Sequence, residues 1–558
     1  MAAETQEPVP SLFMKFPWGN RGRRLRKIRS SIKRRYFGIG NFAFHGGVHA
    51  SADPSQRFQV ELIDGEGRVC GSTIADGKSR KDEIPDGYGF TLPIPLEWLV
   101  ADGAERVFQF RIVETGQVFP AKPRLVPVEK LLRQLKRAEE SGARLGARIR
   151  AIQSDLKGKL APRTIVVGTH EMTRTGAPMI ILEVIRHLTS RHDCRVIALS
   201  LDSEGSLEDS FREVSDLVVP NFDQYLRWAK TEAQDFLSEI ANSQDRPIAL
   251  INSLCSTELA DACDEAGFAV TTLIHEYPYA FERDWVLRHV AAAEAVVFPC
   301  RDVFERFQAE QLITASESDT QFFIQPQGCY QRERPEMEAA ERQAFVDAFR
   351  RENHLRPADR VVVACGTIDS RKGFDWFADL IRHYGTSSPN AFTTHFVWVG
   401  TIRNEDLFQH AIHDMKREGV IGHFHHLDEI DDVRLALGEA DLFLLCSRID
   451  PFPSVVLEAF LAGVPVIAFD RDQGVAEVIR ETGFGKVVPY QDRDATTLAI
   501  DELLARDEQR LGLGEAGAAF VAEQFPFSNY ADRLAGWMFD KEPLSIPGEE
   551  KGTERGVS

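Results

Sequence analysis

Length, composition and charge narrow the class of protein before any motif is considered. A chain of 558 residues with 43% hydrophobic and 27% charged residues is too long for one hydrophobic core and too apolar to be disordered throughout. Its net charge of -19 argues against a general nucleic-acid binder, and no apolar run approaches the roughly 20 residues that span a bilayer. The N-terminal residues also lack the apolar core of a secretory signal, so we expect cytoplasmic residence.

The first segment, residues 1–36, is a basic arm. Lys15 to Arg35 carries ten basic residues and no acidic one, and Leu25, Ile28 and Ile32 recur at helical spacing. This combination suits an amphipathic helix on an anionic membrane surface, which would hold the protein peripherally at the inner face of the membrane. The alternative is a solvated basic tail.

Two short regions follow the arm. Residues 37–127 contain alternating runs such as RFQVELID and RVFQFRIV, separated by turn signals, which predicts a small antiparallel β-domain. Residues 128–160 are helical in pattern, and their apolar positions alternate steps of four and three, as in a coiled-coil seam. This seam predicts either a homodimer through residues 131–156 or a spacer helix packed on its own chain. Its members are Leu131, Leu135, Ala138, Gly142, Leu145, Ile149, Ile152 and Leu156.

From Pro162 onward strands and helices alternate, which is the pattern of doubly wound parallel sheets. Residues 161–335 open with TIVVGT and continue through RVIAL, AVTTLIH and AVVFP. Residues 336–508 open with VVVACG and continue through HFVWVG, DLFLLCS and VPVIAF. Helices are expected over 509–541 and a disordered tail over 542–558. The predicted fold class is α/β, with two Rossmann-like domains preceded by a small all-β domain and a coiled-coil-like helical linker.

The eight cysteines are scattered along the chain, mostly in apolar surroundings. No two of them have CxxC spacing, so the sequence predicts neither disulfides nor a zinc site. We expect reduced thiols in the core.

The segment GTIDSRKG, residues 366–373, leaves the first strand of the second doubly wound domain and carries two adjacent cations toward a helix start. Arg371 offers a rigid fork of donors and Lys372 a point charge. Together they can neutralise a diphosphate that becomes more negative as its bond breaks. The alternative is a solvated strand-to-helix turn.

The segment SRIDPFPSVVLEAFLAGVPVIAF, residues 447–469, combines an acid, a turn, a second acid and a buried strand. Asp450 and Glu458 are separated by seven residues. The prolines after Asp450 favour a turn that leaves backbone N–H groups free, and the run VVLEAFLAG predicts a helix that ends at Gly463. A helix N-terminus and a carboxylate at this place can bind an anion and sugar hydroxyls.

Two loops of the first doubly wound domain also follow strands. In GTHEMTRTGAP, Gly176 and Ala177 allow close backbone approach, and a helix begins near Pro178. His275 opens the run HEY after the strand AVTTLI, where a sugar-contacting or proton-handling group would be useful. The alternatives are an ordinary loop and a structural histidine.

With these motifs in view, residues 161 to 540 resemble the retaining glycosyltransferases of the GT-B fold, family 4 (group 1). GTHEMTRTGAP is similar to the family's amino-terminal glycine loop, LIHEYPY to its histidine loop and GTIDSRKG to its phosphate-binding turn. ADLFLLCSRIDPFPSVVLEAFLAGVPVIAF is similar to its acid-x7-acid signature. The β-domain, residues 37–127, is similar to β-sandwich modules appended to some bacterial polysaccharide glycosyltransferases.

The resemblance implies that the first of these domains lies on the acceptor side and the second binds a nucleotide-sugar donor. Arg371 and Lys372 would hold the diphosphate, Glu458 the ribose, and Asp450 the donor sugar. The donor-binding residues implied are Gly176, Ala177, Gly366, Thr367, Arg371, Lys372, Asp450, Phe452, Pro453, Ser454 and Glu458. The residues implied at the reacting centre are His275, Asp450, Arg371 and Lys372. The donor phosphate would assist deprotonation of the acceptor, so no cofactor, metal or protein nucleophile is expected.

Two positions depart from the family pattern. The family commonly has Glu where Asp450 stands, and Arg where Thr367 follows the strand glycine. The expected function is transfer of a sugar to a glycan or lipid-linked acceptor in surface-polysaccharide or glycolipid biosynthesis. The alternative, which the two departures motivate, is a non-catalytic protein that binds a nucleotide-sugar or serves as a scaffold.

Overall fold

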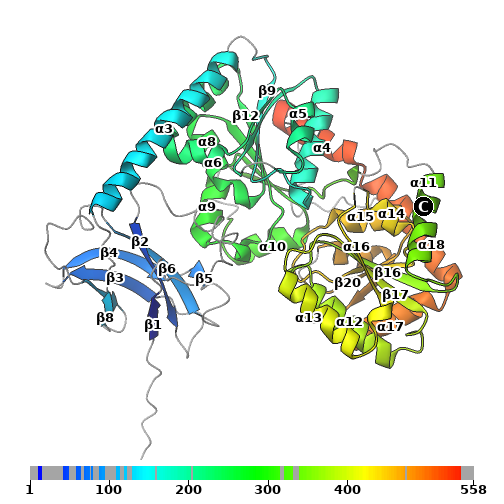
Figure 1. Ribbon diagram of the computed structural model, residues 1–558. Coiled ribbons are helices and arrows are strands. Elements are labelled where there is room, and N and C mark those ends of the chain that lie inside the picture. Colours follow the sequence, from blue (N-terminus) through cyan, green and yellow to red (C-terminus); the bar gives the residue numbers. More distant parts are fainter. Residues whose placement is uncertain are drawn as a thin grey trace, which may run out of the picture. The chain divides into compact units, whose positions relative to one another are not determined.

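The computed structural model describes residues 11–14, 42–49, 58–64, 68–75, 77–78, 87–94, 108–113, 118–121, 128–156, 160–202, 205–313, 320–330, 339–430, 432–471 and 474–541. The chain divides into two compact units (Figure 1). The first unit comprises residues up to Lys159 together with Asp223–Leu237 and Phe281–Trp285, and the second holds the remainder. The basic segment 15–35 and the tail 542–558 lie outside the described residues.

Short antiparallel strands open the first unit, in the sheet orders β1-β2-β6-β5 and β4-β3-β7-β8. Alternation in FQVELID places Val60 and Leu62 on one face, where they are fully buried opposite Ile112 and Phe110. The predicted antiparallel pairing is present, while closure into a sandwich stays a prediction. The strands are β1 (Ser11–Met14), β2 (Phe42–His49), β3 (Phe58–Asp64), β4 (Val69–Ala75), β5 (Gly77–Lys78), β6 (Gly87–Ile94), β7 (Phe108–Ile112) and β8 (Val118–Ala121).

The predicted linker helix forms as α3 (Val128–Leu156). One face of it packs on its own chain: Ile149 is fully buried, and a side chain at Gly142 would overlap the backbone carbonyl of Trp228. Arg150 forms an ion pair with Glu232, with Nη1 and Oε1 2.6 Å apart. These contacts favour the spacer-helix interpretation for the C-terminal half of α3, and the homodimer stays a prediction.

The second unit begins with a seven-stranded parallel sheet in the order β11-β10-β9-β12-β13-β14-β15. Its central strand β9 (Thr164–Thr169) has the bounds that the sequence predicts and is buried along its length. The other strands are β10 (Arg195–Ser200), β11 (Leu217–Val219), β12 (Ile248–Asn252), β13 (Ala269–Leu273), β14 (Ala295–Phe298) and β15 (Gln321–Ile324). The helices along this stretch of the chain are α4 (Gly176–Arg191), α5 (Glu208–Val214), α6 (Phe222–Trp228), α7 (Lys230–Asn242), α8 (Thr257–Glu265), α9 (Arg283–Ala291) and α10 (Arg301–Ala309). Most of α6, most of α7 and the start of α9 belong to the first unit.

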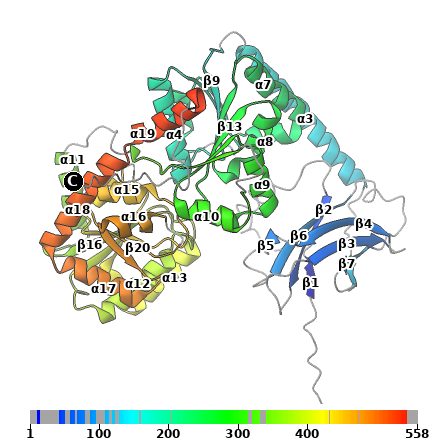
Figure 2. The ribbon, with the colours of Figure 1, turned by 180° about the vertical axis from the view of Figure 1, so that it is seen from behind.

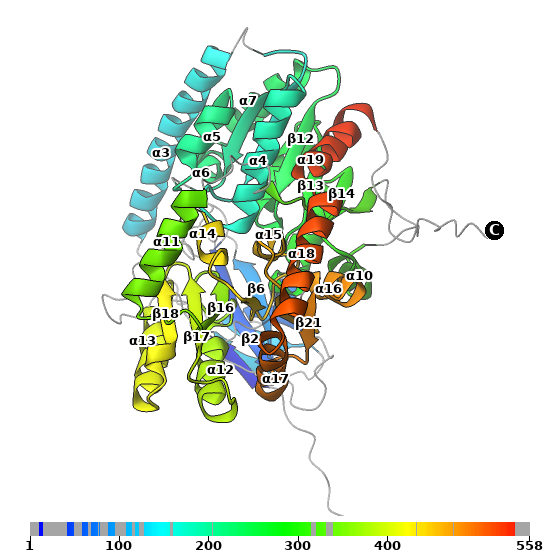
Figure 3. The same ribbon diagram turned by 90° about the vertical axis from the view of Figure 1, so that its right-hand side faces the viewer.

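A six-stranded parallel sheet follows, in the order β18-β17-β16-β19-β20-β21. Figure 3 shows α12 and α13 beside strands β16 to β18. The strands are β16 (Arg360–Cys365), β17 (Thr394–Val399), β18 (Phe424–Leu427), β19 (Leu442–Leu445), β20 (Val466–Phe469) and β21 (Gly485–Val488). The helices are α11 (Ala339–Glu352), α12 (Phe374–Ser387), α13 (Glu405–Arg417), α14 (Arg434–Leu437), α15 (Ser454–Leu461), α16 (Val475–Thr482), α17 (Arg493–Leu504) and α18 (Asp507–Gln524). The predicted pair of doubly wound parallel sheets is confirmed.

The last helix returns to the first sheet. After α18, helix α19 (Phe527–Ala535) and the π-helical turn η6 (Gly536–Asp540) pack into the hydrophobic core beneath β9 and β10. Phe527, Leu534 and Trp537 are buried in this core, and Figure 2 shows α19 beside α4. The first doubly wound domain is therefore completed by residues that follow the second one in the sequence.

No cysteine in the described part of the chain forms a disulfide. Cys194, Cys263, Cys300, Cys329 and Cys446 are buried, whereas Cys255 and Cys365 are half-buried. Burial raises the pKa of the Cys263 and Cys300 thiols to about 12, so they carry no charge at neutral pH. No helix in the described part of the chain combines the length and apolarity needed to cross a bilayer.

Acid is expected to destabilise the second sheet through His425 on its edge strand β18. Burial, together with the neighbouring His395 and His423, lowers the pKa of His425 from 6.5 to about 4. The unfolded chain therefore binds more protons than the native one below pH 6.5, and stability falls between pH 6.5 and 4 and then levels off. A pKa lowered by about 2.5 units, at about 1.4 kcal/mol per unit, limits the loss of stability to about 3.5 kcal/mol.

This loss is measured as the free energy of unfolding in guanidinium chloride from pH 8 to pH 4. His425→Gln is expected to flatten the curve between pH 6.5 and 4. His410→Gln, on the exposed face of α13, serves as the control and should leave the curve unchanged. A His425→Gln curve with the wild-type slope would contradict the assignment.

Candidate functional site

An ion pair between a half-buried lysine and a buried aspartate lies at the carboxyl ends of two neighbouring strands of the second sheet. Lys372 follows β16 and Asp450 follows β19, and Lys372 Nζ lies 2.6 Å from Asp450 Oδ2. The Ser447 hydroxyl donates to the same oxygen at 2.9 Å. Burial would raise the pKa of Asp450, but Lys372 and Arg371 outweigh it, and the pKa lies below its usual value. The structure thus holds an ammonium and an ionised carboxylate together where parallel sheets bind ligands.

The turn that carries Lys372 is organised by Asp369. Its carboxylate accepts from the Lys372 backbone N–H at 2.8 Å and from the Thr367 hydroxyl at 2.9 Å. Gly373, at φ 79°, precedes helix α12, and a side chain there would overlap the Cys446 carbonyl oxygen. Thr367, one of the two departures from the family pattern, therefore shapes the turn and supplies no charge.

Arg371 lies beside the pair on its exposed side. Its Nη1 donates to the Ile449 carbonyl at 3.3 Å, and its own carbonyl accepts from the Arg448 backbone N–H at 2.8 Å. The Arg448 guanidinium in turn donates two hydrogen bonds to the Asp375 carboxylate, at 2.7 and 2.8 Å. The turn after β16 and the loop after β19 are thus tied together, with the Arg371 side chain facing solvent.

The predicted acid–turn–acid segment forms as a loop followed by α15, which begins at Ser454. Phe452 is buried against the Phe525 ring, and Gln327 donates to its carbonyl oxygen. Glu458, on the first turns of α15, is 5% exposed. Buried Ser454 Oγ has no hydrogen-bond partner among the described residues. The helix N-terminus and Ser454 therefore remain available to a ligand, whereas the Phe452 ring serves the core.

Contacts from the first doubly wound domain brace this loop. The Pro451 carbonyl accepts from Cys300 Sγ at 3.7 Å and from the Gly474 backbone N–H at 2.7 Å. A side chain at Gly474 would overlap both Cys300 and Pro451. The conformation of the Asp450 loop thus depends on the position of the helix that begins at Arg301.

A second group of polar side chains lies at the carboxyl ends of β12 and β13. His275 Nε2 donates to Asn252 Oδ1 at 2.8 Å, and Asn252 Nδ2 donates to the Ala177 carbonyl at 3.1 Å. This amide orientation leaves His275 Nδ1 as the acceptor nitrogen. Burial lowers the pKa of His275, so its ring is neutral at pH 7. Ser253, at φ 79° and fully buried, donates to the Glu276 carboxylate.

The predicted glycine loop lies next to this group. Helix α4 begins at Gly176, where a side chain would meet nothing within 4 Å. Glu171 accepts from the Thr173 and Thr175 hydroxyls at 2.8 and 3.1 Å. The neighbouring His170 lowers the pKa of Glu171 to about 2, although burial alone would raise it. Open space at Gly176 is compatible with a ligand that approaches the backbone.

The contacts of the predicted residues fall into two groups. Lys372, Asp450 and Arg371 belong to one, and His275 and Ala177 to the other. Nothing in the described part of the chain joins His275 to the Lys372–Asp450 pair by a hydrogen bond or ion pair. Sequence reasoning missed Asn252, Ser447 and Asp369. Of these three residues, only Asn252 could have been found from the sequence. The apolar run IALI before it predicts a strand, and the end of that strand lies beside the end of the strand AVTTL.

Comparison with known proteins concerns the two doubly wound domains. Residues 359–506 match the sequence profile of the family described as Glycosyl transferases group 1. The chain is 28% identical over 171 residues to the lipopolysaccharide core biosynthesis glycosyltransferase LpsE of Rhizobium meliloti, covering 30% of this chain and 47% of LpsE. It is 35% identical over 82 residues to the amylovoran biosynthesis glycosyltransferase AmsD of Erwinia amylovora, covering 15% of this chain and 23% of AmsD. Both matches span less than half of the relative's own length.

Solved structures share the fold of both doubly wound domains. HepE of Anabaena in complex with UDP superposes with a TM-score of 0.55 at 15% identity, covering 67% of this chain and 98% of HepE. WaaG, a glycosyltransferase involved in lipopolysaccharide biosynthesis, superposes with a TM-score of 0.51 at 15% identity, covering 67% of this chain and 99% of WaaG. The two parallel sheets are thus arranged as in the GT-B fold, and the second of them carries the sequence pattern of the group 1 glycosyltransferases.

Proposed function

We propose that this chain is a retaining glycosyltransferase, which moves a sugar from a nucleotide-sugar to a glycan or lipid-linked acceptor in surface-polysaccharide or glycolipid biosynthesis. The observation that carries the proposal is the Lys372–Asp450 pair at the carboxyl ends of β16 and β19. It lies within the residues that match the group 1 profile. The similarity to LpsE and AmsD supports the kind of product.

In this proposal the second sheet binds the donor. Lys372 and Arg371 neutralise the diphosphate, whose charge grows as the bond to the sugar breaks. Asp450 and the backbone from Phe452 through Pro453 to Ser454 contact the sugar, and Glu458 binds the ribose. Gly366 and Thr367 shape the turn beneath the phosphates. The ion pair keeps the Lys372 ammonium in place before the donor arrives, so little reorganisation is needed on binding.

The first domain supplies the acceptor side. The neutral His275 ring is fixed by Asn252 with Nδ1 as its acceptor nitrogen, which suits a hydrogen bond from a sugar hydroxyl. Gly176 and Ala177 approach the diphosphate. The leaving phosphate takes the proton of the attacking hydroxyl on the same face as departure, so the anomeric configuration is retained without a protein nucleophile or a metal.

The accessory parts of the proposal rest on the sequence. We propose that residues 37–127 form a sandwich module and that the basic segment 15–35 approaches an anionic membrane surface near a lipid-linked acceptor. A homodimer through residues 131–156 would use the N-terminal half of α3, because the C-terminal half packs on its own chain.

The alternative is a non-catalytic protein that binds a nucleotide-sugar. Thr367 motivates it, because the hydroxyl bonds to Asp369 and adds no cation to the site. Incubation of the purified chain with nucleotide-sugars and acceptor extracts separates the two functions through released nucleoside diphosphate. Release supports the enzyme, whereas binding without release supports the alternative.

Donor binding is expected to stabilise the second unit, and UDP is a suitable first ligand because HepE was solved with it. A ligand at about 100 times its dissociation constant adds about 2.7 kcal/mol to the free energy of unfolding. A thermal-shift screen of UDP-, GDP-, ADP- and TDP-sugars measures this. Arg371→Ala should abolish the shift, whereas Arg417→Ala at the end of α13 should retain it. An undiminished shift in Arg371→Ala would remove Arg371 from the site.

A further inference from the structure

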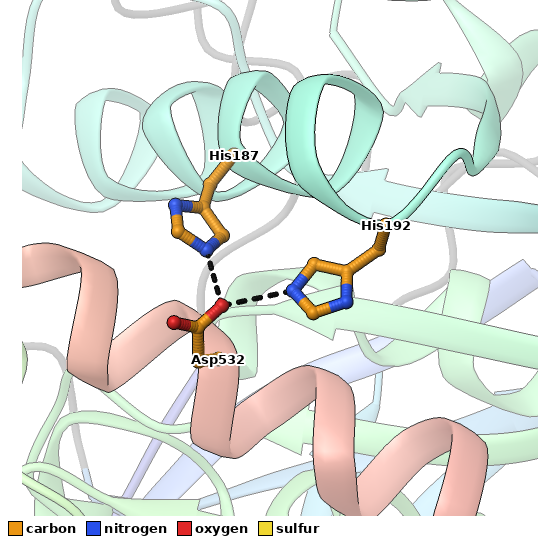
Figure 4. A group of neighbouring side chains, drawn as sticks. All are labelled: His187, His192 and Asp532. Carbon is orange, nitrogen blue, oxygen red and sulfur yellow. Dashed lines mark hydrogen bonds and ion pairs between the residues drawn. The ribbon is translucent and has the colours of Figure 1, made fainter.

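Two histidines and a carboxylate converge where the last helix meets the first domain. His187 Nε2 lies 2.6 Å and His192 Nε2 2.9 Å from the same oxygen, Asp532 Oδ1. Figure 4 shows the two imidazoles on α4 and its C-terminal end aimed at one point beside α19. The three candidate ligand atoms all lie within 4.8 Å of one another.

The local structure explains why the rings converge. His187 lies in the last turns of α4, and His192 is the residue that caps it, with φ -111° and ψ 7°. Leaving the helical conformation at His192 turns its ring back toward the side of the helix that carries His187. The ring centroids are 5.6 Å apart and inclined by 43°. Asp532 lies on α19, 340 residues after His192 in the chain.

We propose that these three residues bind one zinc ion. Two imidazole nitrogens and one carboxylate oxygen form a donor set that zinc prefers, with a water molecule as the fourth ligand. Oxygen-preferring cations such as Mg²⁺ and Ca²⁺ are disfavoured by the two nitrogens. Bonds of about 2.0–2.1 Å in a tetrahedron separate ligand atoms by about 3.3 Å. The present separations of 2.6 and 2.9 Å need to widen by less than 1 Å.

The His187 and Asp532 side chains differ in exposure, and the difference gives the site both a fixed ligand and a path for the ion. The His187 side chain is 5% exposed, so packing fixes its ring, whereas the Asp532 side chain is 47% exposed and gives an ion a way in. Zinc would take the lone pair on each Nε2, leaving the ring protons on Nδ1. The site contains none of the residues proposed for sugar transfer. Its effect would be structural, because the ion links α19 to α4.

The chain offers a matched control. His383 Nε2 and Asp494 Oδ1 are 2.9 Å apart, an ion-pair contact of a single histidine that lacks hydrogen-bond geometry. A glutamine at either kind of histidine keeps an N–H donor for the carboxylate but is a poor zinc ligand. His187→Gln, His192→Gln and His383→Gln therefore separate hydrogen bonding from metal binding.

The experiment uses the full chain, freed of metal with a chelator and then incubated with ZnCl₂. We expect one zinc per chain after gel filtration, measured by mass spectrometry, and an increase in Tm of about 5 °C at zinc well above its dissociation constant. His187→Gln and His192→Gln should lose both effects, and His383→Gln should keep them. Co²⁺ in place of zinc should give the visible absorption of a four-coordinate site in the wild type and in His383→Gln alone.

Two results would overturn the proposal. One is a wild-type chain that retains no zinc after gel filtration and shows no increase in Tm when zinc is added. The other is the same zinc content and Tm gain in His187→Gln and His192→Gln, which would assign the metal to other groups such as the cysteines. If one glutamine variant fails to fold, the other, or Asp532→Asn, provides the same comparison.

Discussion

Replacing Lys372 by alanine is expected to lower kcat/KM for donor turnover by about 10²–10³-fold, the loss typical when one preorganised charge-stabilising group is removed. Its ammonium is the only cation that the described structure holds within 3 Å of Asp450. The developing charge on the leaving diphosphate would otherwise have to be met by the exposed Arg371. Release of nucleoside diphosphate measures the effect.

Stability must be separated from catalysis in this variant, because Lys372→Ala leaves Asp450 buried without its partner. Loss of one member of a buried pair costs about 3–5 kcal/mol. Lys372→Ala combined with Asp450→Asn should recover most of the stability and none of the turnover. Lys486→Ala, which removes a surface pair with Glu502, should change neither quantity. Near-wild-type turnover in a folded Lys372→Ala protein would refute the site assignment.

Gly373→Ala is expected to destabilise the second domain by about 3–5 kcal/mol. The left-handed conformation of Gly373, at φ 79°, costs an alanine roughly 1–2 kcal/mol. Its Cβ would also overlap the Cys446 carbonyl oxygen at the end of β19. Relief of this overlap must move either the strand end or the turn that carries Lys372, so turnover should fall together with stability.

Gly419→Ala isolates the overlap from the backbone conformation. Gly419 has φ 77°, nearly the value at Gly373, and a side chain there meets nothing within 4 Å. Its alanine variant should lose only the roughly 1–2 kcal/mol of the conformational cost. Unfolding in guanidinium chloride compares the two. Equal losses of stability in the two variants would show that the Cys446 carbonyl moves aside at no cost in free energy.

Local patterns predicted the architecture because each strand of the two parallel sheets is a short apolar run with a polar loop after it. That regularity placed Lys372 and Asp450 at carboxyl ends of strands, and the topology then brought them together. The predicted first strand, residues 164–169, has its observed bounds. Residues 359–506, where the predicted phosphate turn and acid–turn–acid segment lie, also carry the group 1 profile.

The supporting contacts could not be predicted, because they join residues far apart in the chain. Gln327 reaches the Phe452 carbonyl across 125 positions, and His187 reaches Asp532 across 345. Thr367 had the appearance of a missing cation, whereas its hydroxyl sets the turn through Asp369. The resemblance predicted which side chains belong to the site, whereas the side-chain hydrogen bonds that hold them could be found only in the structure.

The return of α19 to the first sheet has a consequence during synthesis. Phe323 and Phe527 share one core although 204 positions separate them. At about 5–20 residues per second, a ribosome needs roughly 10–40 s to pass from one to the other. During this interval the emerging first domain exposes the apolar surface that α19 will cover, while the second domain can already fold. The part of the chain made earlier is therefore the last to reach its native core, and nascent chains stalled before Phe527 are the form most exposed to aggregation and chaperones.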